Sequence, residues 1–204
     1  MDTRTVTFWP FVAAMAVVVV ASNVLVQYPF GHFGLQDLLT WGAFTYPFAF
    51  LVTDITNRRF GPAAARRVVY VGFAIAVALS VWLATPRIAI ASGSAFLVAQ
   101  LLDVAVFDRL RRTDWWKAPL VSTVLGSVVD TVVFFSLAFA AAFAVLDFGG
   151  EDGSLAFAVP FLGGEAPLWV SLALGDLAVK LVIGVAMLAP YRVLLALVVP
   201  QPAR

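Results

Sequence analysis

The chain has 204 residues, of which 62% are hydrophobic and only 12% are charged, and its formal net charge is +1. A water-soluble domain of this size needs more polar surface, so this composition, with a mean hydropathy of +0.98, predicts an integral membrane protein. The chain has no cysteine, which excludes disulfides and thiolate metal sites, and its single histidine, His32, argues against a metal centre. We expect no cofactor.

Apolar stretches of about twenty residues recur along the chain, and each is long enough to cross a bilayer as a helix. They lack the apolar–polar alternation of membrane barrel strands. The sequence therefore predicts an all-α polytopic membrane protein, with six transmembrane helices in one domain over residues 1–204. The predicted spans are 8–26, 40–55, 68–84, 88–107, 120–146 and 168–188.

Two connections between these spans are rich in basic residues, which is typical of cytoplasmic connections. Residues 58–67 contain four arginines, and residues 109–117 contain three arginines and one lysine. The last connection on the opposite side is acidic, with Glu151, Asp152 and Glu165. We therefore expect both chain termini to lie in the cytoplasm.

Pro47 lies inside the second predicted span, where it removes a backbone hydrogen bond and frees the carbonyl group near Ala43. We therefore expect a kink in this helix. A freed carbonyl is tolerated in a membrane where protein or a water-filled cavity surrounds it. The kink could be purely structural or could line a ligand site, and the sequence leaves both interpretations open.

Four ionisable residues stand well inside the predicted spans, away from their ends, namely Asp103, Asp130, Asp176 and Lys180. A charge at membrane depth costs roughly 2.5–3.5 kcal/mol on insertion scales, so these residues must pair or line a polar path. Asp176 and Lys180 are four residues apart, which permits an ion pair on one helix face. That pair could serve a ligand or only mutual neutralisation.

Polar residues follow one face of each of two predicted spans. In the fifth span this face carries Thr123, Ser127, Asp130, Thr131 and Phe134. In the fourth span Gln100 and Asp103 share a face. We expect both faces to turn toward the interior of the bundle.

Four further candidates lie near these faces. Asn23 could cap the first helix or contact a ligand, and Trp41 and Tyr46 could be interfacial aromatics or line a site beside the predicted kink. Asp54 lies one turn from Arg58, and we favour a solvated interfacial carboxylate paired with arginine over a ligand contact.

The sequence offers no nucleophile–base pair, phosphate loop or metal-ligand cluster, so we expect the protein not to be an enzyme. The inward-facing carboxylates, amides, hydroxyls and lysine instead suit reversible binding of a small polar molecule.

Two blocks of sequence are specific enough to indicate a family. The first has the sequence TWGAFTYPF at 40–48 and FLVTDIT at 50–56, and the second begins with QLLDV at 100–104 and continues to Asp130-Thr131. Both blocks resemble the bacterial queuosine precursor transporter family, which is also called vitamin-uptake-transporter-like. Ser22-Asn23 and Lys180 are similar to the family pattern as well. The long acidic connection before the last span departs from it.

The resemblance implies uptake of a 7-deazaguanine across the bacterial inner membrane, as either the 7-cyano or the 7-aminomethyl precursor of queuosine, by a stand-alone carrier or facilitator. The guanine edge presents neighbouring N–H donors, which a carboxylate can accept in pairs, and we expect Asp130 or Asp103 to read it. Auxiliary hydrogen bonds or ring stacking are expected from Asn23, Trp41, Tyr46, Gln100 and Thr131. Asp54, Ser127, Asp176 and Lys180 complete the predicted site.

Several alternatives stay open. Asp130 could carry a proton, because apolar surroundings favour the neutral form of a carboxylate, or transport could run downhill without coupling. The chain could instead be the substrate-binding subunit of an energy-coupling-factor importer, which needs an ATPase module, or a purely structural membrane protein. We expect the protein to contact the lipid bilayer and to bind no nucleic acid. Whether it forms a homo-oligomer stays open.

Overall fold

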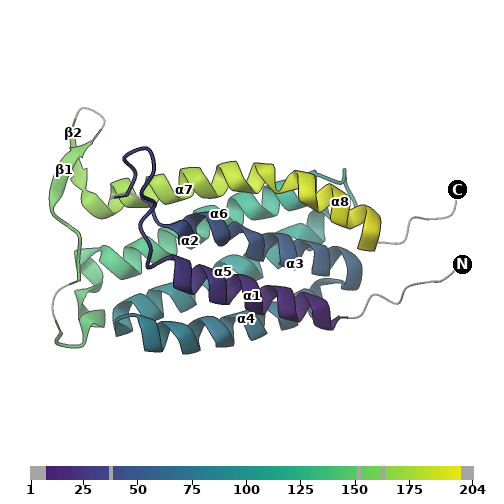
Figure 1. Cartoon of the computed structure of the whole chain (residues 1–204), viewed down its shortest axis with the longest axis horizontal. Helices are drawn as coiled ribbons and strands as arrows, with labels where there is room; N and C mark the ends of the chain where they lie inside the picture. The colour runs from purple at the N-terminus through teal and green to yellow at the C-terminus, as the bar shows by residue number, and fades with distance from the viewer. Residues whose placement is uncertain (1–7, 37–38, 151–152, 162–163, 199–204) are drawn as a thin grey trace, which may run out of the picture.

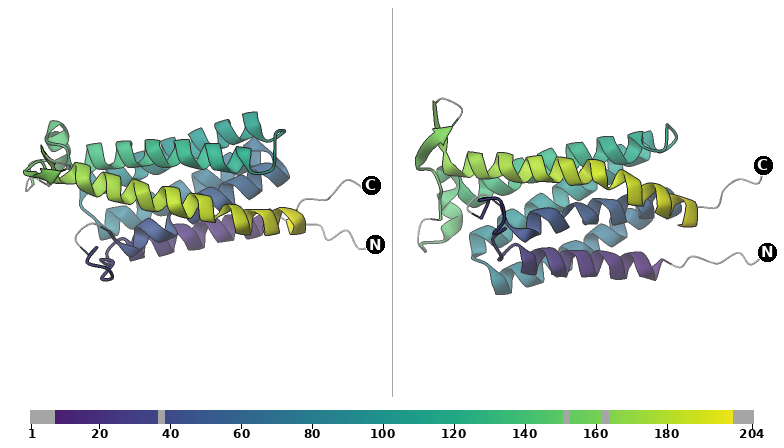
Figure 2. Two further views of the ribbon diagram at one scale, coloured as in Figure 1. Left: turned by 90° about the horizontal axis from the view of Figure 1, so that it is seen from above. Right: turned by 45° about the horizontal axis from the view of Figure 1, so that its top comes forward.

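The computed structural model describes residues 8–36, 39–150, 153–161 and 164–198, so Glu151 and Asp152 of the acidic connection lie outside the described residues. The elements are α1 (Trp9–Leu25), α2 (Trp41–Thr45), α3 (Pro47–Phe60), α4 (Pro62–Leu83), α5 (Pro86–Leu110), α6 (Lys117–Phe139), the 3₁₀ helix η1 (Ala141–Asp147), β1 (Ala158–Phe161), β2 (Gly164–Pro167), α7 (Leu168–Ala186) and α8 (Leu188–Val198). The long helices run side by side in an elongated bundle (Figure 1). Helix α1 begins and α8 ends at the same end of it (Figures 1 and 2).

The described chain is mostly helical, as predicted, with one added feature. Strands β1 and β2 form an antiparallel hairpin in which Val159 pairs with Ala166, in the connection that the sequence analysis left without structure. This hairpin lies at the end of the bundle away from the start of α1 (Figure 1).

Among the described residues, four helices are long and apolar enough to cross a membrane, namely α4, α5, α6 and α7. Helices α1 and α8 are apolar but shorter, and the second predicted span is divided between α2 and α3. The presence of six spans and the side on which the termini lie therefore stay predictions.

The predicted kink at Pro47 is confirmed as a break between α2 and α3. Pro47 is the first residue of α3, a position where its missing N–H is not needed. The same missing N–H leaves the carbonyl of Ala43, four residues earlier, without its helical donor. Gly42 fits the short helix against α1, because a Cβ there would lie 2.8 Å from the Cα of Val26.

A second break, which the sequence analysis did not predict, separates α7 from α8 at Met187. Pro190 explains it, because proline cannot donate to the carbonyl of Ala186 and its ring clashes with that group. Figure 2 shows the chain changing direction there. As a result Tyr191 of α8 is buried, with 1% of its surface exposed, and it packs against Phe107 of α5.

The predicted span 120–146 is wrong at its far end, because α6 gives way to η1 there. Arg87 of α5, 1% exposed, donates from Nε to the carbonyl of Leu137 at 2.9 Å and from Nη2 to that of Ala140 at 2.6 Å. It thus gives a donor to the carbonyl of Leu137 at the end of α6 and a second donor to that of Ala140, which also accepts from the Phe143 N–H at 3.0 Å. Its Nη1 forms an ion pair with Asp147 at 2.8 Å, which holds η1 back against the bundle.

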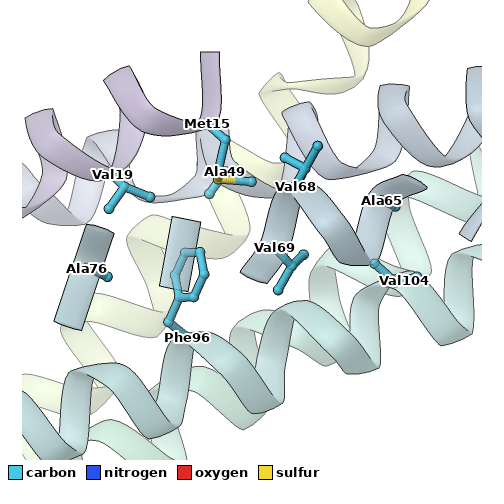
Figure 3. Close-up of a cluster of buried hydrophobic side chains, with 9 residues drawn as sticks. All are labelled: Met15, Val19, Ala49, Ala65, Val68, Val69, Ala76, Phe96 and Val104. Carbon is cyan, nitrogen blue, oxygen red and sulfur yellow. The ribbon is translucent and has the colours of Figure 1, made fainter. Parts of the chain in front are cut away.

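A dry core joins α1, α3, α4 and α5. Its side chains point toward one another in Figure 3 and are Met15, Val19, Ala49, Ala65, Val68, Val69, Ala76, Phe96 and Val104. Gly72 permits this packing, because a Cβ at that position would lie 2.8 Å from Cγ of Met15. Small residues at such contacts are the usual device for close helix packing in membranes.

Replacing Arg87 by alanine is expected to destabilise the protein by about 3–5 kcal/mol, because Asp147 would remain as a largely buried charge without its partner and the carbonyl of Leu137 would lose its side-chain donor. The measurement is the thermal midpoint of unfolding in detergent. Arg109→Ala, at an exposed position on the same helix, is the control and should leave the midpoint within error. Equal midpoints for both variants would contradict the capping role.

Candidate functional site

One large cavity, of about 460 Å³, opens among the helices, a size suited to a small-molecule ligand. Its walls come from helices α1 to α7 and from the connection between α1 and α2. The lining residues Ala84, Ile88, Phe139 and Leu172 stand where α4 and α6 end and where α5 and α7 begin. The cavity therefore lies toward the end of the bundle that carries the hairpin.

A charged network forms the polar part of the cavity. Lys180 Nζ lies 2.7 Å from Asp130 Oδ2 and 2.5 Å from Asp176 Oδ2. The predicted pair of Asp176 and Lys180 is thus confirmed, and Asp130 joins it from the neighbouring helix. Thr131 Oγ1 donates to Asp176 at 3.0 Å. Two carboxylates share one ammonium group, so the network carries a net negative charge when both are ionised.

Tyr46 completes this network from the break between α2 and α3. Its hydroxyl donates to Asp130 Oδ1 at 2.7 Å, and Lys180 Nζ lies 5.1 Å from the centre of its ring. Ala43, whose carbonyl lost its helical donor, lines the same cavity. The kink therefore forms part of the cavity wall. This position favours the interpretation in which the kink at Pro47 lines a ligand site over a purely structural kink.

Helix α1 and the residues after it also contribute hydroxyl and amide groups to the cavity wall. Ser80 of α4 donates to Asn23 Oδ1 at 3.1 Å, and Asn23 Nδ2 donates to the carbonyl of Val19 at 2.9 Å. Ser22 donates to Thr45 at 3.1 Å, which links α1 to α2. Asn23 thus lines the cavity as predicted, but its amide already connects two helices.

The sequence analysis missed several lining residues. They are Ser22, Gln27, Gln36, Ser92, Phe135 and Phe139. The rings of Phe134, Phe135 and Phe139 pack on one another with centroids 5.2–6.0 Å apart. Phe134, which the sequence placed on the polar face of the fifth span, lines the cavity one helical turn after Asp130. Gln36 lies in a connection, where no helical spacing points to it.

Trp41, by contrast, does not line the cavity. It is 39% exposed and packs its ring against Phe30, His32 and Phe44 on the surface of the connection. This position fits the interfacial role that the sequence left open.

Four other predicted residues lie outside the cavity lining, buried between α3, α5 and α6. They are Asp54, Gln100, Asp103 and Ser127, with exposures of 2%, 0%, 0% and 0%. Thr53 Oγ1 donates to Gln100 Oε1 at 2.7 Å across α3 and α5. The predicted inward turn of the two polar faces is thus confirmed, while the residues divide between the cavity and a second polar cluster.

The interpretation of Asp54 as a solvated carboxylate paired with arginine is wrong. Asp54 is buried and accepts a hydrogen bond from Ser122 of α6 at 3.3 Å. Arg58 donates instead to the Tyr191 hydroxyl at 2.9 Å and to the carbonyl of Arg111. Helix α8, brought back by the break at Met187, covers the region that the sequence left at the membrane surface.

Comparison with known proteins places the chain in a family. The model described as "Putative vitamin uptake transporter" matches residues 40–85 and 79–194. The chain belongs to this family. It is 35% identical to the "Queuosine precursor transporter" of Escherichia coli (strain K12) over 208 residues, which cover 91% of this chain and 85% of the relative. No solved structure gives a significant match.

Two further members of the family are similar to the chain. The "Probable queuosine precursor transporter" of Haemophilus influenzae is 35% identical and is aligned over 85% of this chain and 79% of its own length. The Bacillus subtilis protein of the same description is 30% identical over 59% of this chain and 64% of its own length. The family and the apolar helices together identify a multi-pass membrane protein.

Removing the lysine of the network should destabilise the bundle. Lys180→Met leaves Asp130 and Asp176 adjacent without a cation, a loss that typically costs about 3–5 kcal/mol when a buried pair is broken. We expect a lower thermal midpoint in detergent and partial recovery when Asp130→Asn and Asp176→Asn are added. Val182→Met, at an exposed position on α7, is the matched control. A single variant as stable as the wild type would refute the pairing role.

Proposed function

We propose that the protein takes up a queuosine precursor, 7-cyano- or 7-aminomethyl-7-deazaguanine, across the bacterial inner membrane as a stand-alone carrier or facilitator. The observation that carries the proposal is the network of Tyr46, Asp130, Asp176 and Lys180, which lines a ligand-sized cavity in a bundle of apolar helices. The similarity to transporters named for this solute supports it.

The network offers groups that complement a guanine edge. That edge presents the O6 acceptor beside the N1–H and N2–H donors, so a carboxylate beside an ammonium group matches it in sign. Asp130 or Asp176 would accept the two N–H donors in a bidentate way, and Lys180 would donate to O6. Tyr46 and Phe134, which also line the cavity, would contact the face of the ring.

The proposed topology has six crossings, with both termini in the cytoplasm. Helices α4 to α7 supply four crossings, α1 supplies one, and α2 with α3 supplies another as a broken helix. The basic residues 58–67 and 109–117 lie around the junctions of α3 with α4 and of α5 with α6, at the end where α1 begins (Figure 1). The cavity, at the opposite end, would then face outward, as expected for one state of alternating access.

The absence of cysteine makes this topology directly testable. We expect Gly31→Cys, in the exposed α1–α2 connection, to react with a membrane-impermeant maleimide on intact spheroplasts. Thr113→Cys, exposed between α5 and α6, should react only after the membrane is permeabilised. The unsubstituted chain is the control for background labelling. The reverse pattern would contradict the proposed orientation.

Binding of the 7-deazaguanines tests the solute. We expect the cyano or the aminomethyl compound to raise the thermal midpoint of purified protein, with guanine as the reference ligand. Asp130→Asn should weaken binding about tenfold to a hundredfold, because a hydrogen bond to a charged group contributes roughly 1.5–3 kcal/mol. Asp108→Asn, on the surface of α5, is the control and should bind like the wild type. No shift with any compound in folded protein would overturn the proposal.

Uptake by the chain alone then tests the mode of transport. Proteoliposomes that contain only this chain should take up the radiolabelled compound that binds. A chain that binds but does not transport would instead support the substrate-binding subunit of an energy-coupling-factor importer. A chain that neither binds nor transports would support a structural role.

A further inference from the structure

A second polar site lies deeper in the bundle than the cavity. Asp54 of α3 and Asp103 of α5 are buried, and their carboxyl groups lie next to each other and near Ser122 of α6. Ser122 Oγ donates to Asp54 Oδ1 at 3.3 Å. Both carboxylate oxygens of Asp103 are fully buried and have no hydrogen-bond donor among the described residues.

No cation forms an ion pair with either carboxylate in the part of the chain that the structure describes. Arg58, one turn along α3, acts on Asp54 electrostatically but donates its hydrogen bonds to the Tyr191 hydroxyl and the carbonyl of Arg111. Tyr191, the other titratable group that faces Asp54, receives the bond from Arg58. Lys180 is held by the two carboxylates of the cavity.

Two adjacent buried carboxylates repel each other, so one of them keeps a proton, as in carboxyl pairs that share a single proton. The protonated oxygen then donates to the other carboxylate. Such a bond would supply the donor that the oxygens of Asp103 lack. Burying carboxylate oxygens without a hydrogen-bond donor is costly, and a shared proton would remove that cost for Asp103. The arrangement therefore points to a proton as the species that the two carboxyl groups bind.

We propose that Asp54 and Asp103 form a proton-binding site, distinct from the solute cavity, that couples proton entry to solute uptake. In each cycle the pair would take one proton from external water and release it to the cytoplasm. The coupling rests on the proposed function, whereas the sharing of a proton does not. A metal ion is a poorer occupant, because it needs a larger set of oxygen ligands than this site presents.

The position of the site fits this role. Phe50, 0% exposed, stands one turn after Tyr46 and one turn before Asp54 on α3. Its ring packs so closely on α6 that a Cβ at Gly126 would lie 2.7 Å from it. Phe50 thus separates the cavity from the carboxyl pair.

A small second cavity lies on the other side of Asp54. It measures about 10 Å³, near the smallest space that holds one water, and is lined by Asp54, Thr123 and Tyr191 beside the break between α7 and α8. Separation of α8 from α3 would open this space toward the end of the bundle that we propose to be cytoplasmic. The pair therefore has an exit that is independent of the solute cavity.

Infrared spectroscopy tests the shared proton directly. Purified wild-type protein at neutral pH should show the carbonyl stretching band of a protonated carboxyl group, and Asp103→Asn should lose it. Asp54→Asn should lose the same band, which protects the test against misfolding of either variant. Thr56→Val, which removes a buried hydroxyl from the same helix without touching a titratable group, should keep the band. Wild-type protein without the band would overturn the proton site.

Transport tests the coupling. An external medium one pH unit more acidic than the vesicle lumen should raise solute accumulation up to about tenfold if one proton moves with each molecule. Asp103→Asn should equilibrate the solute without responding to the gradient, whereas Thr56→Val should respond like the wild type. A response to sodium in place of protons would overturn the proposal.

The two proposals can fail separately. Wild-type protein that binds and transports the 7-deazaguanine but ignores the pH gradient would overturn the coupling and leave the proposed function standing. Wild-type protein that binds no 7-deazaguanine would overturn the proposed function and with it the coupling to this solute. The infrared band would still decide whether Asp54 and Asp103 share a proton.

Discussion

The structure depends on the cost of placing an ammonium group inside an apolar bundle. Lys180 is buried, so it must find anions within reach, and it finds one on its own helix and one on α6. The bond to Asp130 fixes α7 against α6, and the bond from Tyr46 to Asp130 adds the α2–α3 break to the same point. The need of one ammonium group for anionic partners thereby determines where α6, α7 and the α2–α3 break meet. It also determines which part of the cavity wall is polar.

Two prolines bring the tyrosines of this bundle to their partners. Pro47 breaks the chain after Tyr46, whose hydroxyl reaches Asp130 in the cavity. Pro190 breaks it before Tyr191, whose hydroxyl accepts from Arg58 near the other end. A helix that loses a backbone hydrogen bond at proline can bend there. In this structure each bend turns a tyrosine ring toward the interior of the bundle. The breaks therefore supply polar contacts that straight apolar helices could not.

Sequence reasoning succeeded where local spacing decides the outcome and failed where distant contacts decide it. The pair of Asp176 and Lys180 follows from a spacing of four residues, and the break at Pro47 follows from one missing N–H. The contact between Asp130 and Lys180 joins residues 50 positions apart, so helix packing alone creates it. The end of α6 before residue 146 depends on Arg87, which lies 50 positions before its partner Leu137. The local sequence near Leu137 therefore does not predict where the helix ends.

Asp54 shows the same limit and leads to the arrangement on which the proposed proton site rests. Its arginine neighbours indicated a solvated surface, but α8 folds back over α3 and α5 lies beside it, so the carboxylate meets Asp103 instead. Helix α3 consequently carries Phe50 and Asp54 and begins next to Tyr46, with one turn between successive residues. A tilt of α3 would shift all three together, so solute contact, closure beneath the cavity and exposure of the carboxyl pair are joined by one rigid element.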